Sequence, residues 1–161
     1  HIILQGGVGS FPAAICSYFW EKYHKNNIKF VIVESEHAPC LIQSAKKGEM
    51  ISINIKEETM MAGLSCGEPS LLGWKILEKG ADDFVTISDQ SIPSMMRLLS
   101  NHNPPIEAGE SSVAGLAALI EITENNEIAK KIGINSESII LLFGTEGATD
   151  PKIYHSIIRA D

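Results

Sequence analysis

Glycines near the start of the chain are the residues whose spacing first suggests chemistry. The segment HIILQGGVGSFPAAICS places Gly6, Gly7 and Gly9 between an apolar run and a helical pattern. Glycine adopts backbone angles that a Cβ forbids, so the turn can gather the backbone amides of residues 8–10 at the N-terminus of a helix. Bare amides and a helix dipole bind anions such as phosphate. The turn therefore predicts a phosphate site; the alternative is a tight strand-to-helix turn without a ligand.

The cysteines are the second group of reactive side chains. Three cysteines, Cys16, Cys40 and Cys66, are too few and too unevenly spaced for a disulfide framework or a zinc knuckle. We therefore assign no metal ligands and expect reduced thiols, with Cys16 in the core. Cys40 and Cys66 are both expected at the carboxyl edge of a parallel sheet. There they could lie close enough to form a bond that orders a loop, or serve only as packing residues.

The elements that must position these groups alternate along the chain. Apolar runs and helical patterns follow one another, which is typical of an α/β fold: an open, mostly parallel, twisted sheet with helices on both faces. The predicted strands cover residues 2–5, 29–34, 50–53, 83–87 and 138–143. The predicted helices cover residues 11–25, 37–47, 71–79, 89–100, 111–123 and 151–159. The predicted boundary residues are Ser10, Gly48, Ser70, Gly80, and Thr149 or Asp150.

A long irregular stretch, KEETMMAGLSCGEP, occupies residues 56–69. Long loops in compact domains are often binding loops, so we expect this loop to contribute to a site. The alternative is a short helix over residues 59–64 that only covers the sheet.

Composition limits the size and the partners of the protein. The chain has 161 residues, 44% of them hydrophobic, which is enough for one core, so we expect a single α/β domain over residues 1–161. A net charge of −7 without a cluster of basic residues argues against nucleic acid and against an anionic membrane as partners. No apolar run approaches the roughly 20 residues that span a bilayer, and no leader peptide is visible. We therefore expect a cytoplasmic protein.

Five segments, in chain order, resemble the C-terminal part of the diaminopropionate ammonia-lyase family: QGGVGS, IVESEHAPC, TMMAGLSCGEPSLLGW, EAGESSVAGL and FGTEGATD. The resemblance covers essentially the whole chain, and MAGLSCGEPSLLGW separates this family from threonine dehydratases and cysteine synthases. The family belongs to the pyridoxal-phosphate enzymes of the tryptophan-synthase β-like fold. The resemblance implies an enzyme that converts a small amino acid, 2,3-diaminopropionate, to pyruvate and ammonia by elimination, as a homodimer with one covalently held cofactor per subunit.

The same resemblance implies where the cofactor, pyridoxal 5'-phosphate, would bind. Its phosphate would lie against the glycine turn, at Gly7, Val8, Gly9 and Ser10. Its ring nitrogen would bond to the hydroxyl of Thr145, at the exit of the last strand. The position before it, often serine in the family, is Gly144 here, so the assignment rests on Thr145 alone. A hydroxyl does not stabilise a protonated ring as a carboxylate does, which fits elimination chemistry. Thr145 could instead only cap a turn before the last helix.

Other polar residues have both a functional and a structural interpretation. Glu34 could place a carboxylate behind the cofactor, or accept hydrogen bonds from backbone amides at the end of its strand. Glu110 and Ser111 could lie near the site, although a helix-capping role is favoured. Glu146 is equally compatible with a solvated turn and with the site.

The family's Schiff-base lysine and proposed acidic bases correspond to positions upstream of the matched segments. The chain begins at His1, within a strand and without a methionine, so we expect a preceding segment to be missing. We therefore assign no catalytic residue to this chain and expect it to be inactive alone. A second interpretation is a non-catalytic module that binds a small ligand or phosphate. A dinucleotide-binding domain is disfavoured, because Pro12 follows Phe11 where a third glycine is expected.

Overall fold

The computed structural model describes residues 1–23 and 27–160 and shows one parallel sheet with the strand order β3-β2-β1-β4. The strands are β1 (Ile2–Gln5), β2 (Phe30–Ser35), β3 (Asp83–Ile87) and β4 (Leu141–Leu142). The α-helices are α1 (Ser10–Tyr23), α2 (Cys40–Lys47), α3 (Leu71–Gly80), α4 (Ile92–Ser100), α5 (Ala114–Glu124), α6 (Asn126–Ile132) and α7 (Pro151–Arg159). Two 3-10 turns, η1 (Ala62–Leu64) and η2 (Asp89–Ser91), complete the elements described below.

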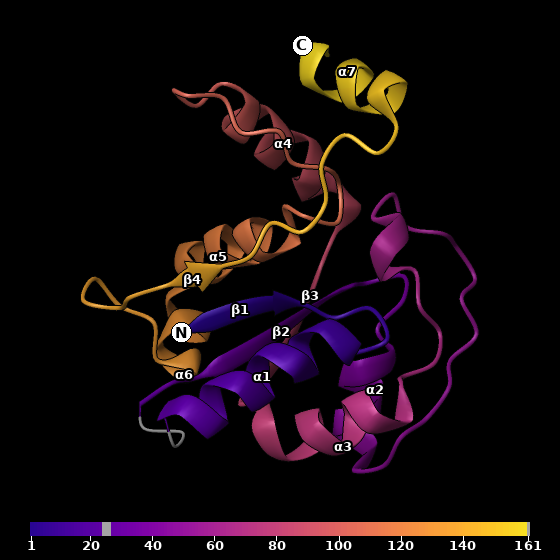
Figure 1. Cartoon of the computed structure of the whole chain (residues 1–161), viewed down its shortest axis with the longest axis vertical. Coiled ribbons are helices and arrows are strands. Elements are labelled where there is room, and N and C mark those ends of the chain that lie inside the picture. Colours follow the sequence, from indigo (N-terminus) through magenta and orange to yellow (C-terminus); the bar gives the residue numbers. More distant parts are fainter. Residues whose placement is uncertain (24–26, 161) are drawn as a thin grey trace.

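Helices cover both faces of the sheet, which confirms the expected α/β fold class (Figure 1). Alternate residues of the central strands supply two separate cores. One core, shared with helices α4 to α7, contains Ile3, Val31 and Val33. The other, shared with α1, α2 and α3, contains Ile2, Leu4, Phe30 and Ile32. Because both faces of β1 and β2 are buried, their sequences are continuous apolar runs rather than alternating ones.

Two of the predicted strands were wrong in whole or in part. Residues 50–53 join no sheet: Ile51 donates its amide proton to Ser44 Oγ (3.1 Å), and Ile53 donates to the carbonyl of Gly67 (2.8 Å). The position beside β2 is taken by β3. The last strand shrinks to β4 because a turn closes just before it, and Leu141 is the residue whose amide reaches the carbonyl of His1 (2.9 Å).

Helix boundaries follow most of the predicted signals. Ser70 and Asp150 accept hydrogen bonds from the first turns of α3 and α7, and Gly48 ends α2 with a φ of 74°. Ser10 is not an N-cap, because it is the first residue of α1 and Gly9 accepts the amide proton of Ala13 (3.0 Å). The predicted end of this helix at residue 25 lies outside the described residues.

Gly80 has a different role from the predicted one. It is the last residue of α3 rather than a left-handed glycine after it. A Cβ there would lie 2.4 Å from Cζ2 of Trp20, so the glycine allows α1 and α3 to pack closely.

Helix α6 was not predicted, although Asn125 caps it and Gly133 ends it with a φ of 86°. Among the residues that the structure describes, no helix is long and apolar enough to cross a membrane.

Candidate functional site

A pocket of about 580 Å³ lies beside the end of β1 and joins four separate parts of the chain. These are the glycine turn, the loop of residues 56–69, the segment before α5, and the segment between β4 and α7. Gly7, Val8, Ser10 and Thr145 all line the pocket. Gly9 does not line it, so of the five predicted site residues the structure brings four together.

The glycine turn has the backbone that its sequence predicted. Gly7 and Gly9 have φ angles of 57° and 89°, values that favour glycine. A Cβ on Gly7 would lie 3.1 Å from the carbonyl oxygen of Gly63, a residue of the loop that also lines the pocket. A Cβ on Gly9 would lie 3.1 Å from both Leu41 and Leu77, in the core. Gly7 therefore shapes the pocket, while Gly9 lets the turn pack against the core behind it.

The amides of the turn are well suited to bind an anion. Gly9 donates its amide proton to the carbonyl of Gly6 (3.0 Å) and is already satisfied. Within the described part of the chain, the amides of Gly7 and Ser10 donate to no protein acceptor. Free amides at the N-terminus of a 14-residue helix attract a phosphate group, so these residues fit the cofactor that the resemblance implies.

Glu34 lies behind the glycine turn rather than in the pocket. Its two carboxylate oxygens accept the amide protons of Leu41 (2.8 Å) and Ile42 (2.7 Å) at the start of α2. A Cβ on Gly6 would lie 2.8 Å from Glu34 Cγ, so the side chain packs directly under the turn. Burial raises the pKa of Glu34 to about 7, and the two amides offset part of that shift. The structural interpretation of this residue fits the contacts.

The raised pKa of Glu34 predicts a pH-dependent stability. The native state binds this proton more tightly than the unfolded state, so the contribution is full below pH 4.5 and is lost as the pH rises through about 7. When the pH falls from about 8 to about 5, the free energy of unfolding of the full-length protein is expected to rise. This rise is expected to exceed that of Glu34→Gln by up to about 3 kcal/mol. Unfolding midpoints at the two pH values measure this change. Parallel profiles of the two proteins would contradict it.

Thr145 is exposed and lines the pocket. It directly precedes residues 146–148, which two carboxylates hold against residues 107–111. Glu146 accepts the amide proton of Ser111 through Oε2 (2.7 Å), and its carbonyl accepts that of Gly109 (3.0 Å). In the opposite direction, Glu107 Oε1 accepts the amide proton of Ala148 (3.1 Å). These contacts fix the backbone that directly follows Thr145.

Gln5 was missed by the sequence reasoning. Its Nε2 donates to the carbonyls of Phe143 (2.6 Å) and Ser112 (3.0 Å), and so it links the end of β1 to both segments beside Thr145. A polar residue that ends a buried apolar strand was the available signal.

Ser111 connects the loop to this arrangement. Its Oγ accepts the amide proton of Gly63 (3.1 Å), while its own amide donates to Glu146. The capping role favoured for residues 110 and 111 was wrong, because α5 begins at Ala114 and has no side-chain cap. Glu110 does not line the pocket, whereas Ser111 and Glu146 do.

None of the three cysteines forms a disulfide bond in the structure. Cys16 is buried in the core as predicted, and Cys66 lines the pocket. Cys40 Sγ lies 3.6 Å from the carbonyl oxygen of Gly7. Burial, followed by the charge of Glu34, raises the pKa of Cys40 to about 12. A bond between Cys40 and Cys66 stays a prediction.

No lysine within residues 1–23 and 27–160 lines the pocket. The pocket therefore offers groups for a phosphate and for a ring nitrogen, but no amine for a covalent bond to a carbonyl carbon. Any such amine has to come from outside the described residues of this chain.

A parallel sheet with a glycine turn, an α-helix N-terminus and a pocket at the end of a strand is the arrangement in which α/β proteins bind phosphorylated ligands. A family model described as "Pyridoxal-phosphate dependent enzyme" matches residues 1–143, and the chain belongs to this family. It is 34% identical to diaminopropionate ammonia-lyase of Escherichia coli (strain K12) over 98% of its own length. The chain spans 41% of the length of that relative.

Solved structures agree with this assignment. The fold matches diaminopropionate ammonia-lyase from Escherichia coli in complex with an aminoacrylate-PLP azomethine reaction intermediate, with a TM-score of 0.87 and 33% identity. That match covers 99% of this chain and 42% of the other. A structure of the same enzyme in complex with D-serine matches with a TM-score of 0.88 and 33% identity, over 99% of this chain and 41% of the other.

Proposed function

We propose that this chain belongs to a pyridoxal-phosphate dependent ammonia-lyase that converts 2,3-diaminopropionate to pyruvate and ammonia. One observation carries the proposal: the predicted phosphate turn and the predicted ring-nitrogen partner, Thr145, line the same pocket although they lie at opposite ends of the chain. The identity of 34% to the Escherichia coli enzyme over nearly the whole chain supports the choice of substrate.

The residues of this chain have binding and orienting roles in the proposed reaction. The amides of Gly7, Val8 and Ser10, together with the dipole of α1, hold the phosphate. The hydroxyl of Thr145 holds the ring nitrogen, and the loop of residues 56–69 closes one wall of the pocket against water. When bound, pyridoxal phosphate supplies the electron sink for proton removal at the substrate α-carbon. The lysine that binds the cofactor covalently is expected from the rest of the full-length protein.

We also propose that the full-length protein is a cytoplasmic homodimer with a small amino acid as its substrate. The three cysteines, none of which forms a disulfide bond, support a cytoplasmic location. The D-serine complex of the Escherichia coli relative supports a pocket for small amino acids.

The stoichiometry of the reaction tests the proposed function. Elimination from 2,3-diaminopropionate, followed by hydrolysis, consumes one water and gives one pyruvate and two ammonia molecules, whereas elimination from serine gives one ammonia for each pyruvate. We expect the full-length protein, saturated with pyridoxal phosphate, to release ammonia and pyruvate in a ratio of two to one from diaminopropionate. The expected rate is higher than with D-serine.

Three results would contradict the proposal or change its substrate. Faster turnover of serine would assign a dehydratase. Cofactor binding without turnover of either amino acid would favour the non-catalytic module that binds a small ligand or phosphate. The absence of cofactor binding would remove the site altogether.

A further inference from the structure

The loop of residues 56–69 forms one wall of the pocket but has little regular structure to hold its shape. Gly63, Leu64 and Cys66 line the pocket, and η1 is the one short element within the loop. A wall that contacts a cofactor must keep its backbone in place, because small displacements remove contacts. Some group outside the loop therefore has to fix it.

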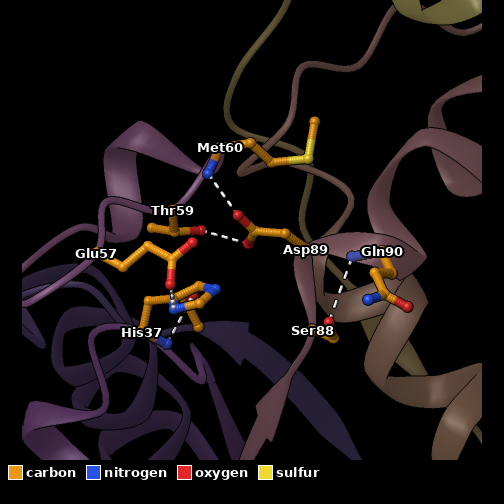
Figure 2. Close-up of polar contacts among 8 residues, drawn as sticks. His37, Glu57, Thr59, Met60, Ser88, Asp89 and Gln90 are labelled. Atoms are coloured by element: carbon orange, nitrogen blue, oxygen red, sulfur yellow. Dashed lines mark hydrogen bonds and ion pairs between the residues drawn. The ribbon is translucent and has the colours of Figure 1, made fainter.

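Asp89, in η2 after β3, makes the contacts that such a group would make. Figure 2 shows its carboxylate directed at the loop, with one oxygen on the hydroxyl of Thr59 and the other on the backbone amide of Met60. The distances are 2.5 Å to Thr59 Oγ1 and 2.7 Å to the Met60 nitrogen. Both carboxylate oxygens are thus used on adjacent residues of the loop.

The hydroxyl of Thr59 extends this contact further into the loop. Thr59 is 6% exposed, and its Oγ1 accepts the amide proton of Met61 (3.2 Å) while it donates to Asp89. The side chain of Met61 is completely buried in the core. Asp89 therefore satisfies one buried hydroxyl and one backbone amide, and the hydroxyl in turn satisfies a second amide. Leaving buried donors unpaired is costly, so the contacts of Asp89 stabilise the loop in this shape.

The geometry points to Asp89 as a positioning residue for the cofactor pocket, an inference that rests on the proposed function. It fixes the loop at residues 59 and 60, and Ser111 fixes it again at Gly63 (3.1 Å). The segment between these two contacts, residues 60–63, ends at Gly63, whose carbonyl oxygen lies next to Gly7 of the glycine turn. Asp89 does not line the pocket, and it acts on the cofactor through the loop.

A neighbouring contact in Figure 2 differs in kind. His37 Nδ1 lies 3.7 Å from a carboxylate oxygen of Glu57, whose side chain is 76% exposed. Exposed pairs of this type contribute little, so this contact does not replace Asp89.

Substitutions in the full-length protein test the role of Asp89. We expect Asp89→Ala to raise the dissociation constant for pyridoxal phosphate roughly fivefold, and Thr59→Val roughly threefold. Asp89→Asn keeps one acceptor oxygen and is expected to restore most of the affinity. The double variant is expected to bind no more than about twofold more weakly than Asp89→Ala, because both changes remove the same interaction.

Ser91→Ala is the matched control. Ser91 lies in the same turn, and its hydroxyl donates to Glu121, away from the loop. This variant is expected to keep the wild-type affinity. Hydrogen exchange is expected to increase in residues 56–69 of Asp89→Ala and to stay unchanged in that loop of Ser91→Ala.

Some results would overturn the inference. Unchanged cofactor affinity in both Asp89→Ala and Thr59→Val would do so. An equal loss of cofactor affinity in Asp89→Asn and Asp89→Ala, with hydrogen exchange increased throughout the protein, would also do so. Cofactor affinity is read without any substrate. A wild-type protein that fails to turn over diaminopropionate would therefore count against the proposed function, and the Asp89 variants would still be tested.

Discussion

Gly7→Val in the full-length protein is expected to weaken the binding of pyridoxal phosphate by more than about a hundredfold. Gly7 has a φ of 57°, which valine adopts only with strain. The added Cβ would also lie 3.1 Å from the carbonyl oxygen of Gly63, in the neighbouring loop. The turn has to move away from the loop, and the amides of Gly7 and Val8 move with it. Since hydrogen bonds to a charged group are strong, losing two of them gives the expected effect. Titration with the cofactor, followed by its visible absorption, measures the change.

Gly48→Val is the control for Gly7→Val, because it introduces backbone strain without changing the pocket. Gly48 has a φ of 74°, but a Cβ there would meet no atom within 4 Å, and the residue lies outside the pocket. Both variants are expected to lose thermal stability, whereas cofactor affinity is expected to fall only for Gly7→Val. An equal loss of affinity in the two variants would mean that the glycine turn holds no phosphate.

The sequence was a good guide to those elements whose local and tertiary signals agree. Buried parallel strands need continuous apolar residues, so β1 and β2 were visible as runs of Ile, Val and Leu. The partly buried edge strand β3 was visible from Phe84, Val85 and Ile87. The stretch at residues 50–53 has the same local character, yet it joins no sheet, because β3 takes the place beside β2. A sequence pattern predicts that a segment is extended and half-buried. It does not predict which neighbouring strand or loop supplies the hydrogen bonds to its backbone.

Residues of the candidate site could be predicted from the sequence where their residue type has few structural roles. They could not be predicted where the residue type has many roles. Closely spaced glycines after a strand have a small set of backbone roles, so Gly7 was found from the sequence. Gln5, Glu107 and Asp89 are polar residues of ordinary types, and their partners lie between 29 and 138 positions away in the chain. Only the folded backbone brings these partners together. Gly9 was also assigned to the phosphate site from the glycine spacing, and in the structure its amide donates to the carbonyl of Gly6.

The glycine turn and Thr145 are held in one geometry by a shared set of contacts. Gln5 immediately precedes the turn and donates to the carbonyl of Phe143, two positions before Thr145. Glu146, the next residue, holds Ser111, which in turn holds the loop at Gly63. The spacing between the glycine turn and Thr145, the proposed phosphate and ring-nitrogen partners, is therefore set by hydrogen bonds between the backbone and buried or partly buried side chains. A change to the Thr145 side chain can remove one contact to the cofactor and leave that spacing intact.

Thr145→Val is accordingly expected to weaken cofactor binding and lower turnover by up to about tenfold, without a loss of thermal stability. Valine has nearly the same shape but cannot donate a hydrogen bond to the ring nitrogen. Thr145→Ser keeps the hydroxyl and is expected to restore most of the affinity. Thr123→Val is the control, because Thr123 is exposed at the end of α5 and its hydroxyl donates to the carbonyl of Leu119 (2.9 Å). If Thr145→Val kept the wild-type affinity and lost thermal stability instead, Thr145 would be a turn residue, and the ring nitrogen would need another partner.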